Sequence, residues 1–212
     1  MSQPRRFRRP AGLDPRDADK LIGGIDPAAQ AELAHSSAQG LVARARDEAP
    51  EDPELTGRLI ALVENEGIET LAQLWALSAP DSLPGALWRV YALREWVRRD
   101  PCTVSERYKL GEQRQSVARV VAGAVEPPGP DEMLRLADAV LSGLFVGELD
   151  IALERAAAFA RILSTGSALD ADWLDDADPL HAAALTRRAE GLLSTAEALE
   201  RAAARWRQNK LE

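Results

Sequence analysis

A strict seven-residue repeat runs through residues 178–207, DPLHAAALTRRAEGLLSTAEALERAAARWR. Large apolar residues recur on one row and alanines on the row beside it: Leu185, Leu192, Leu199 and Trp206, with Ala182, Ala189, Ala196 and Ala203. Such a repeat keeps one face of a helix turned toward a partner helix, and small alanines let the two backbones approach closely. The segment therefore predicts a long helix packed on another helix at a shallow crossing angle.

Two partners for this row are open. One lies in the same chain, because residues 148–164 carry a similar pattern of Leu149, Leu153, Ala156, Ala160 and Leu163. A connection of about 14 residues would let the two segments form an antiparallel helical hairpin. The other partner is the same row of a second copy, which would give a homodimer through the C-terminal helix. We favour the internal hairpin, in which the row is a seam inside one chain.

The rest of the chain also predicts helices. Asp-Pro pairs at 26–27, 52–53, 100–101 and 178–179 are typical helix starts, because Asp accepts from the first free amides and Pro tolerates the first helical position. Glycines at 67, 111 and 123 are interpreted as helix ends. We therefore expect an all-α fold, a multi-helix bundle of about eight or nine helices. The expected segments are 26–45, 53–65, 69–78, 84–99, 101–110, 113–122, 131–142, 148–164 and 178–207.

Proline placement suggests how the chain is divided. Residues 1–18 combine Pro, Gly and clustered Arg without periodicity, which indicates a disordered basic arm. The stretch 126–130, EPPGP, is the strongest helix break in the sequence. We expect an N-terminal helical part at 19–126 and a C-terminal helical part at 127–212, packed together as one compact unit.

The charge distribution is uneven. The chain has a formal charge of −8, yet residues 1–9 contain four arginines and no acid, so the remainder carries −12. These arginines, which are Arg5, Arg6, Arg8 and Arg9, form a candidate partner-binding tail for nucleic acid or for an acidic protein surface. No apolar run approaches the roughly 20 residues of a membrane span, and the single cysteine excludes an intrachain disulfide. We expect a cytoplasmic protein without a membrane partner.

Two arginines fall within an otherwise apolar segment. Residues 84–99, PGALWRVYALREWVRR, form the most apolar predicted helix, and Arg94 and Arg98 lie one turn apart in or beside its apolar arc. A guanidinium there must reach water along its stem or pair with a carboxylate. These two residues are therefore candidates for partner binding, with snorkelling or a structural ion pair as the plainer alternative.

Motifs of catalysis and metal binding are missing from the sequence. It has two histidines, His35 and His181, and no nucleophile elbow, phosphate loop or dinucleotide glycine motif. The acidic string between residues 170 and 178 fails as a calcium loop, because the positions that need an oxygen ligand and a glycine hold Leu174 and Asp175. We interpret these acids as residues gathered before a helix N-terminus, and we expect no enzyme activity, cofactor or metal.

One segment resembles part of a known DNA-binding fold. Residues 116–141, SVARVVAGAVEPPGPDEMLRLADAVL, loosely resemble the latter part of a lambda-repressor-like helix-turn-helix domain. The resemblance implies a recognition helix before Gly123 and a supporting helix after the proline-rich turn. The supposed recognition helix offers Arg114 and Arg119, and few other side chains that read base edges.

Together these patterns favour a non-enzymatic cytosolic helical protein that acts by binding another protein, as an adaptor or regulator. The alternative is a DNA-binding transcriptional regulator that uses residues 113–141 and the arginine-rich arm.

Overall fold

The computed structural model describes residues 26–45, 57–58, 67–122, 127–143 and 148–211, apart from the side chains of 115–122. All of the regular secondary structure in these ranges is α-helical, so the all-α prediction is confirmed. None of the described helices is long and apolar enough to cross a membrane. The helices are α2 Pro27–Ala45, α4 Ile68–Trp75, α5 Leu83–Arg99, α6 Pro101–Ala122, α7 Pro130–Leu141, α8 Leu149–Leu174 and α9 Pro179–Arg207.

The Asp-Pro pairs begin helices where the structure describes them. The Asp26 carboxylate accepts from the amide of Ala28 at 3.0 Å, and that of Asp100 from the amide of Thr103 at 3.3 Å. Asp178 likewise accepts from the amide of His181 at 3.1 Å. Each carboxylate satisfies an amide that the helix leaves without an internal partner. The fourth pair and the proposed arm at 1–18 lie outside the described residues. Of the predicted helix at 53–65, only residues 57–58 are described, and both are helical.

Two predicted boundaries are wrong, and both involve glycine. The expected helices at 101–110 and 113–122 are one continuous helix, α6, which passes through Gly111. The expected helix at 148–164 continues through Gly166 to Leu174, so the connection to α9 is only residues 175–178. Both glycines lie where α6 and α8 cross, and a Cβ on either would come within 3.0 Å of a carbonyl oxygen of the other helix. Helix packing therefore outweighs the intrinsic helix-ending tendency of glycine.

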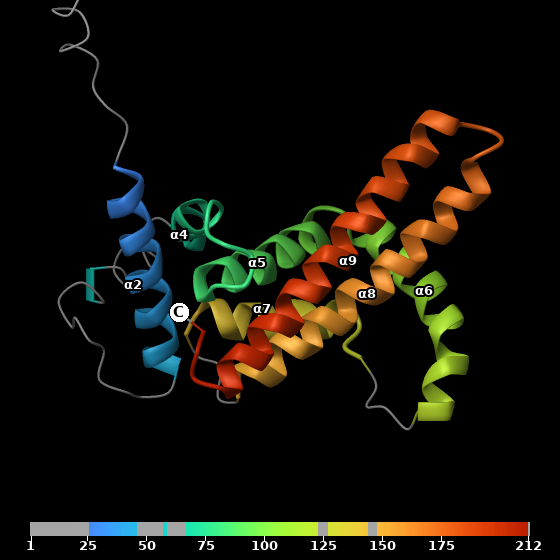
Figure 1. Ribbon diagram of the computed structural model, residues 1–212. Coiled ribbons are helices and arrows are strands. Elements are labelled where there is room, and N and C mark those ends of the chain that lie inside the picture. The colour runs from blue at the N-terminus through green and yellow to red at the C-terminus, as the bar shows by residue number, and fades with distance from the viewer. Residues whose placement is uncertain (1–25, 46–56, 59–66, 123–126, 144–147, 212) are drawn as a thin grey trace, which may run out of the picture.

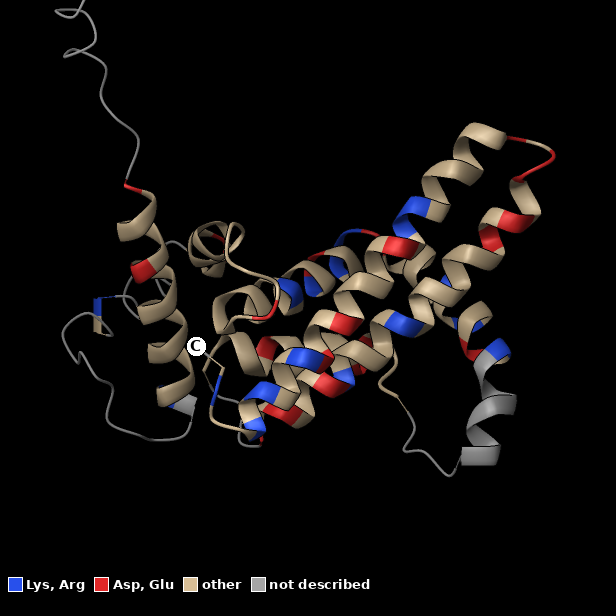
Figure 2. Ribbon diagram, viewed as in Figure 1, with Lys and Arg blue, Asp and Glu red and all other residues tan. Residues whose placement is uncertain are grey.

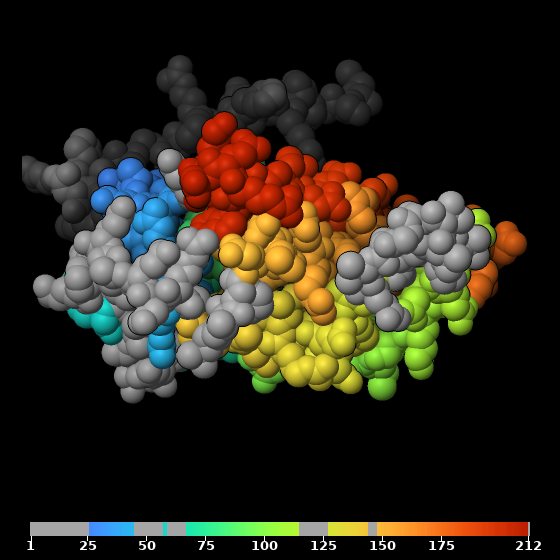
Figure 3. All heavy atoms as spheres, turned by 90° about the horizontal axis from the view of Figure 1, so that it is seen from below, coloured from blue at the N-terminus to red at the C-terminus, as the bar shows by residue number. Residues whose placement is uncertain are grey.

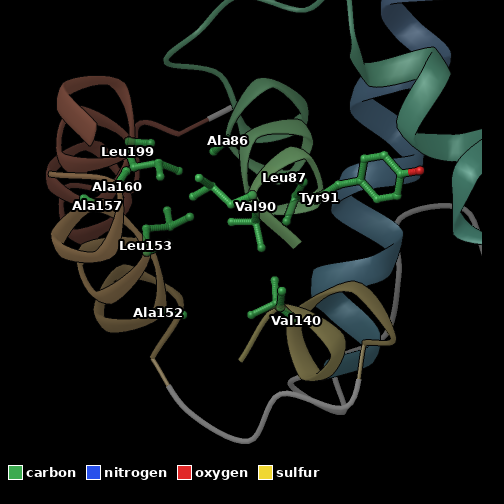
Figure 4. Packing of buried hydrophobic residues seen from close by; sticks show 14 of the residues in the cluster. Ala86, Leu87, Val90, Tyr91, Val140, Ala152, Leu153, Ala157, Ala160 and Leu199 are labelled. Carbon is green, nitrogen blue, oxygen red and sulfur yellow. The ribbon is translucent and has the colours of Figure 1, made fainter. Parts of the chain in front are cut away.

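Helix α5 lies at the centre of the molecule. It packs against α2, α4, α6, α7, α8 and α9, and much of its circumference is buried. Figure 4 shows Val90 of α5 between Leu153 of α8 and Val140 of α7. The view from below in Figure 3 shows α7 on the surface between α2 and α6, beneath the start of α8. The division expected between residues 126 and 127 stays a prediction.

Helices α8 and α9 share the most extensive helix–helix contact among the described elements. Arg207, at the end of α9, pairs with Asp150 at the start of α8. Arg161 pairs with Glu200, and the Ser164 hydroxyl donates to the carbonyl oxygen of Ala189 at 2.7 Å. Residue numbers rise along α8 as they fall along α9, so the two helices run in opposite directions. Figure 1 shows their connected ends reaching beyond the other helices.

Candidate interaction surface

The alanine–leucine row of α9 lies inside the chain. Seven of its eight residues are buried, and Trp206 is partly buried against the core. The row divides into two parts. The members nearer the C-terminal end belong to the main hydrophobic cluster, whereas Ala182, Leu185 and Ala189 are buried outside it. The contact of α8 with α9 agrees with the internal partner, and a homodimer through this row stays a prediction.

Arg94 and Arg98 take part in ion pairs within the chain. Arg94 Nε pairs with Asp138 of α7, and its Nη1 lies 2.8 Å from Glu95 Oε1. The Arg94 side chain is only 15% exposed, so this pair ties α5 to α7. Arg98 is half exposed and lies 3.3 Å from the same Glu95 oxygen. These positions agree with the structural alternative for both arginines, and their role in partner binding stays a prediction.

Further arginines hold α9 in place. Arg161 forms two hydrogen bonds with Glu200, of 2.6 and 2.7 Å, and this bonding raises the pKa of its guanidinium. Arg207 bonds both Glu154 and Asp150, which raises its pKa in the same way. Arg205 Nη2 lies 2.8 Å from Asp81 Oδ2, before α5, and Arg188 lies 5.7 Å from the centre of the Trp96 ring. The long helix is thus fixed on both α8 and α5.

The remaining sequence-derived DNA-binding residues are only partly described. Arg5, Arg6, Arg8 and Arg9 lie outside the described residues, as does the side chain of Arg119. Arg114 is exposed on α6. The supposed recognition helix is predicted to begin near residue 113. In the structure it is the second half of α6, which begins at Pro101 and whose first half packs against other helices.

The histidines, the cysteine and the polar lining of one hollow are the described groups that bear on chemistry at the surface. His181 and Cys102 are exposed, and His35 is half-buried on α2. No group of three or more histidine, cysteine or acidic side chains suited to a metal ion occurs among the described residues. An open hollow of about 370 Å³ between α6, α8 and α9 is lined by Arg161, Ser164 and Thr165 among others. The Ser164 hydroxyl donates to the carbonyl oxygen of Ala189 and the Thr165 hydroxyl to that of Arg161.

The outer end of the α8–α9 pair exposes large apolar side chains. We call residues 172–181 the tip: it comprises the last turn of α8, the connection and the first turn of α9. Trp173 is 67% exposed and Leu180 is 85% exposed. Every other tip residue is also exposed except Leu174, which is half-buried. An exposed Leu alone is ordinary, but a Trp and a Leu that are both mostly exposed within one ten-residue segment are unusual.

The tip is also strongly acidic. It contains Asp172, Asp175, Asp176 and Asp178, and no Lys or Arg occurs anywhere between Arg161 and Arg187. Figure 2 shows acidic residues at this end of α8 and α9, with basic residues farther along the helices. Among the described residues, no ion pair neutralises these four aspartates. The neighbouring Asp170 differs, because it lies within α8 and its Oδ2 is 3.2 Å from Nε of the buried Arg107.

The sequence interpretation missed this surface. It placed Trp173 in a long loop and treated the acids from 170 to 178 as one group before a helix. In the structure Asp170 and Asp172 lie within α8, and only Asp178 caps α9. The sequence signal that could have indicated this surface is Trp173, which lies outside the heptad row and among aspartates. Its exposure depends on how far α8 and α9 extend past α5 and α6, which periodicity alone does not show.

Comparisons with known proteins give no match to any family model, curated protein or solved structure.

Proposed function

We propose that this chain is a non-enzymatic helical protein that acts by binding another protein, and that the tip of α8 and α9 is its binding surface. The observation that carries the proposal is the exposure of Trp173 and Leu180 at the same projecting end of the molecule. Tryptophan is enriched among residues that dominate binding energy, because it buries a large area with little loss of side-chain freedom. A localisation in the cytoplasm belongs to the same proposal.

The support beneath the tip is suited to this role. The Arg107–Asp170 pair joins α8 to α6 just below it, and Asp178 caps the first turn of α9. The buried Ala171, Ala182 and Leu185 fill the space between the two helices there. A rigid support reduces the conformational entropy that binding must remove, which favours affinity. We therefore interpret α8 and α9 as an antiparallel hairpin. Its alanine–leucine row is an internal seam that keeps the two helices packed together and so supports the tip.

The acidic rim adds specificity to the apolar centre. Four aspartates around Trp173 and Leu180 would favour a partner with basic residues beside an apolar surface, and would repel an acidic one. The same charge opposes contact between the tip and DNA. The DNA-binding alternative depends instead on the arginine-rich arm and residues 113–141, and it predicts salt-sensitive binding to duplex DNA that Arg119→Glu removes.

The test is affinity capture from an extract of the native cell, with the purified chain as bait. The variant that carries both Trp173→Ala and Leu180→Ser should lose the proteins that the unchanged chain retains. The matched control is Leu77→Ser, because Leu77 is 83% exposed but lies between α4 and α5. Each variant must keep the helical circular dichroism and the unfolding temperature of the parent chain.

Two results would refute the proposal. One is the same set of retained proteins with the doubly substituted tip as with the parent chain. The other is an equal loss with Leu77→Ser, because that result would indicate general surface adhesion in place of a defined binding surface.

A further inference from the structure

We infer that the tip binds the arginine-rich segment Arg5–Arg9 of a second copy of this chain. The inference rests on the proposed function, since it names the partner of the same surface. Two features carry it: an exposed Trp and Leu in an acidic setting on the tip, and a short run of this sequence with the opposite charge and its own aromatic residue.

The two surfaces are complementary in charge. The segment RRFRR at 5–9 contains four arginines and no acid, whereas the tip contains four aspartates and no lysine or arginine. The tip aspartates have no basic partner among the described residues, unlike Asp170, which is held by Arg107. Arginine pairs with carboxylates through two parallel hydrogen bonds, which gives direction as well as attraction.

The apolar residues are complementary as well. Phe7 stands between two pairs of arginines, and the tip offers Trp173 and Leu180 as apolar surface. An aromatic pair contributes about 0.5–1.5 kcal/mol beyond the area that it buries. A guanidinium stacked on an exposed indole adds a cation–π contact. The same segment can therefore satisfy both the acidic and the apolar parts of the tip.

The position of α2 indicates a second copy as the source of the arm. Figure 1 shows the beginning of α2 on the side of the molecule opposite the tip. Between Arg9 and Pro27 lie residues 10–26, and a relaxed chain of 17 residues spans roughly 23 Å. Helix α9 alone, with 29 residues, is about 43 Å long. This average span is shorter than α9, so reaching the tip of the same chain would require a stretched segment, whereas the tip of a second copy can approach the arm without stretching it.

The first experiment measures binding of a labelled peptide of residues 1–12 by fluorescence anisotropy. The receptor is the full chain with Arg5, Arg6, Arg8 and Arg9 changed to Ser, so that its own arm does not compete. We expect saturable binding in low salt that weakens as salt rises from roughly 0.05 M to 0.5 M, because surface charges become screened. Two further receptors carry an additional change in the tip, and each should bind the peptide at least tenfold more weakly. One carries Trp173→Ala, and the other carries Asp172→Asn, Asp175→Asn and Asp176→Asn together. Asp178 is kept, since it caps α9.

The peptide itself supplies matched controls. A peptide with Phe7→Ala keeps every charge and should bind several-fold more weakly if Phe7 contacts the tip. Receptor with Leu77→Ser should bind the parent peptide unchanged. Absence of binding in low salt would overturn the inference, as would equal binding to the parent receptor and to the receptor with neutralised aspartates.

The second experiment measures the mass of the full, unchanged chain by sedimentation as its concentration rises. We expect self-association in low salt, lost in high salt and lost in the chain with the four Arg→Ser changes. A chain that remains monomeric above the concentration at which the peptide binds would overturn the second-copy assignment. If native capture depends on Trp173 while the peptide fails to bind, the proposed function stands and this inference falls.

Discussion

Gly166 of α8 lies directly against the main chain of Arg107 in α6, and a Cβ at residue 166 would be less than 3.0 Å from the Arg107 carbonyl oxygen. Gly111 of α6 makes the reciprocal approach to the carbonyl of Ile162 in α8. The two glycines let the backbones touch where the helices cross. This crossing supports the outer part of α8, and through it the tip.

The first prediction concerns this crossing. Gly166→Ala should lower the free energy of unfolding by about 3 kcal/mol or more, because the obstructing atoms are main-chain atoms that cannot rotate away. The gain in helix propensity, about 1 kcal/mol, is smaller than this cost. Urea unfolding followed by circular dichroism measures the difference.

The matched control is Gly191→Ala in α9. No atom lies within 4 Å of a Cβ placed there, and Gly191 is exposed in mid-helix. The same substitution should raise the free energy of unfolding by about 0.5–1 kcal/mol. Equal effects at residues 166 and 191 would show that the close approach of α6 and α8 has no energetic importance.

These glycines also show what the sequence could and could not predict. Asp-Pro pairs are local signals, and those at 100–101 and 178–179 mark the starts of α6 and α9 because one side chain and one ring determine each start. Glycine is ambiguous, because it ends isolated helices yet also permits close helix contact. Choosing between these roles at Gly111 and Gly166 requires knowing that α6 and α8 cross there.

The second prediction concerns the buried ion pair between α6 and α8. The Arg107 side chain is 8% exposed and its Nε bonds Asp170. Asp170→Ala should cost roughly 2–3 kcal/mol, somewhat less than the about 3–5 kcal/mol typical of broken buried pairs, because Asp170 is itself about one-third exposed. Combining Arg107→Met with Asp170→Leu should recover most of the loss, since no unpaired buried charge remains. Chemical denaturation of the three variants checks this, and a further loss in the double variant would contradict it.

The third prediction separates the two parts of the α9 row. Leu199 belongs to the main hydrophobic cluster, and Leu185 is buried only between the outer parts of the helices. Leu199→Ala should cost about 3–5 kcal/mol and lower the protection of all core amides, whereas Leu185→Ala should cost about 2 kcal/mol. In the Leu185→Ala variant, the loss of amide protection should be confined to the outer turns of α8 and α9.

Hydrogen exchange followed by mass spectrometry measures both effects. If the row were instead a dimer interface, Leu185→Ala would lower the oligomer mass at unchanged local protection. That result would contradict the internal seam. Truncation of a residue packed inside one chain should leave the oligomer mass unchanged.

The site was less accessible to sequence reasoning than the fold. The heptad row marks which residues of α9 are buried, since burial on a helix follows a period of about 3.6. Function depends on the opposite question, namely which apolar residues stay exposed. Trp173 and Leu180 are exposed because the helices that cover α8 and α9 elsewhere do not reach their connected ends. No periodic signal in a single sequence records where neighbouring helices stop.

The last prediction tests whether the exposed apolar residues serve folding at all. Trp173→Ala and Leu180→Ala should each change the free energy of unfolding by no more than about 0.5 kcal/mol, because both side chains already contact water in the folded chain. Phe159→Ala is the contrasting variant: Phe159 is fully buried and stacks on Tyr108, so its removal should cost about 3–5 kcal/mol. Thermal and urea unfolding of the three variants make the comparison. A large loss from Trp173→Ala would mean that the indole stabilises the connected ends of α8 and α9, and its exposure would then no longer argue for a binding partner. A negligible loss, together with lost capture, leaves binding as the property that the tip residues supply.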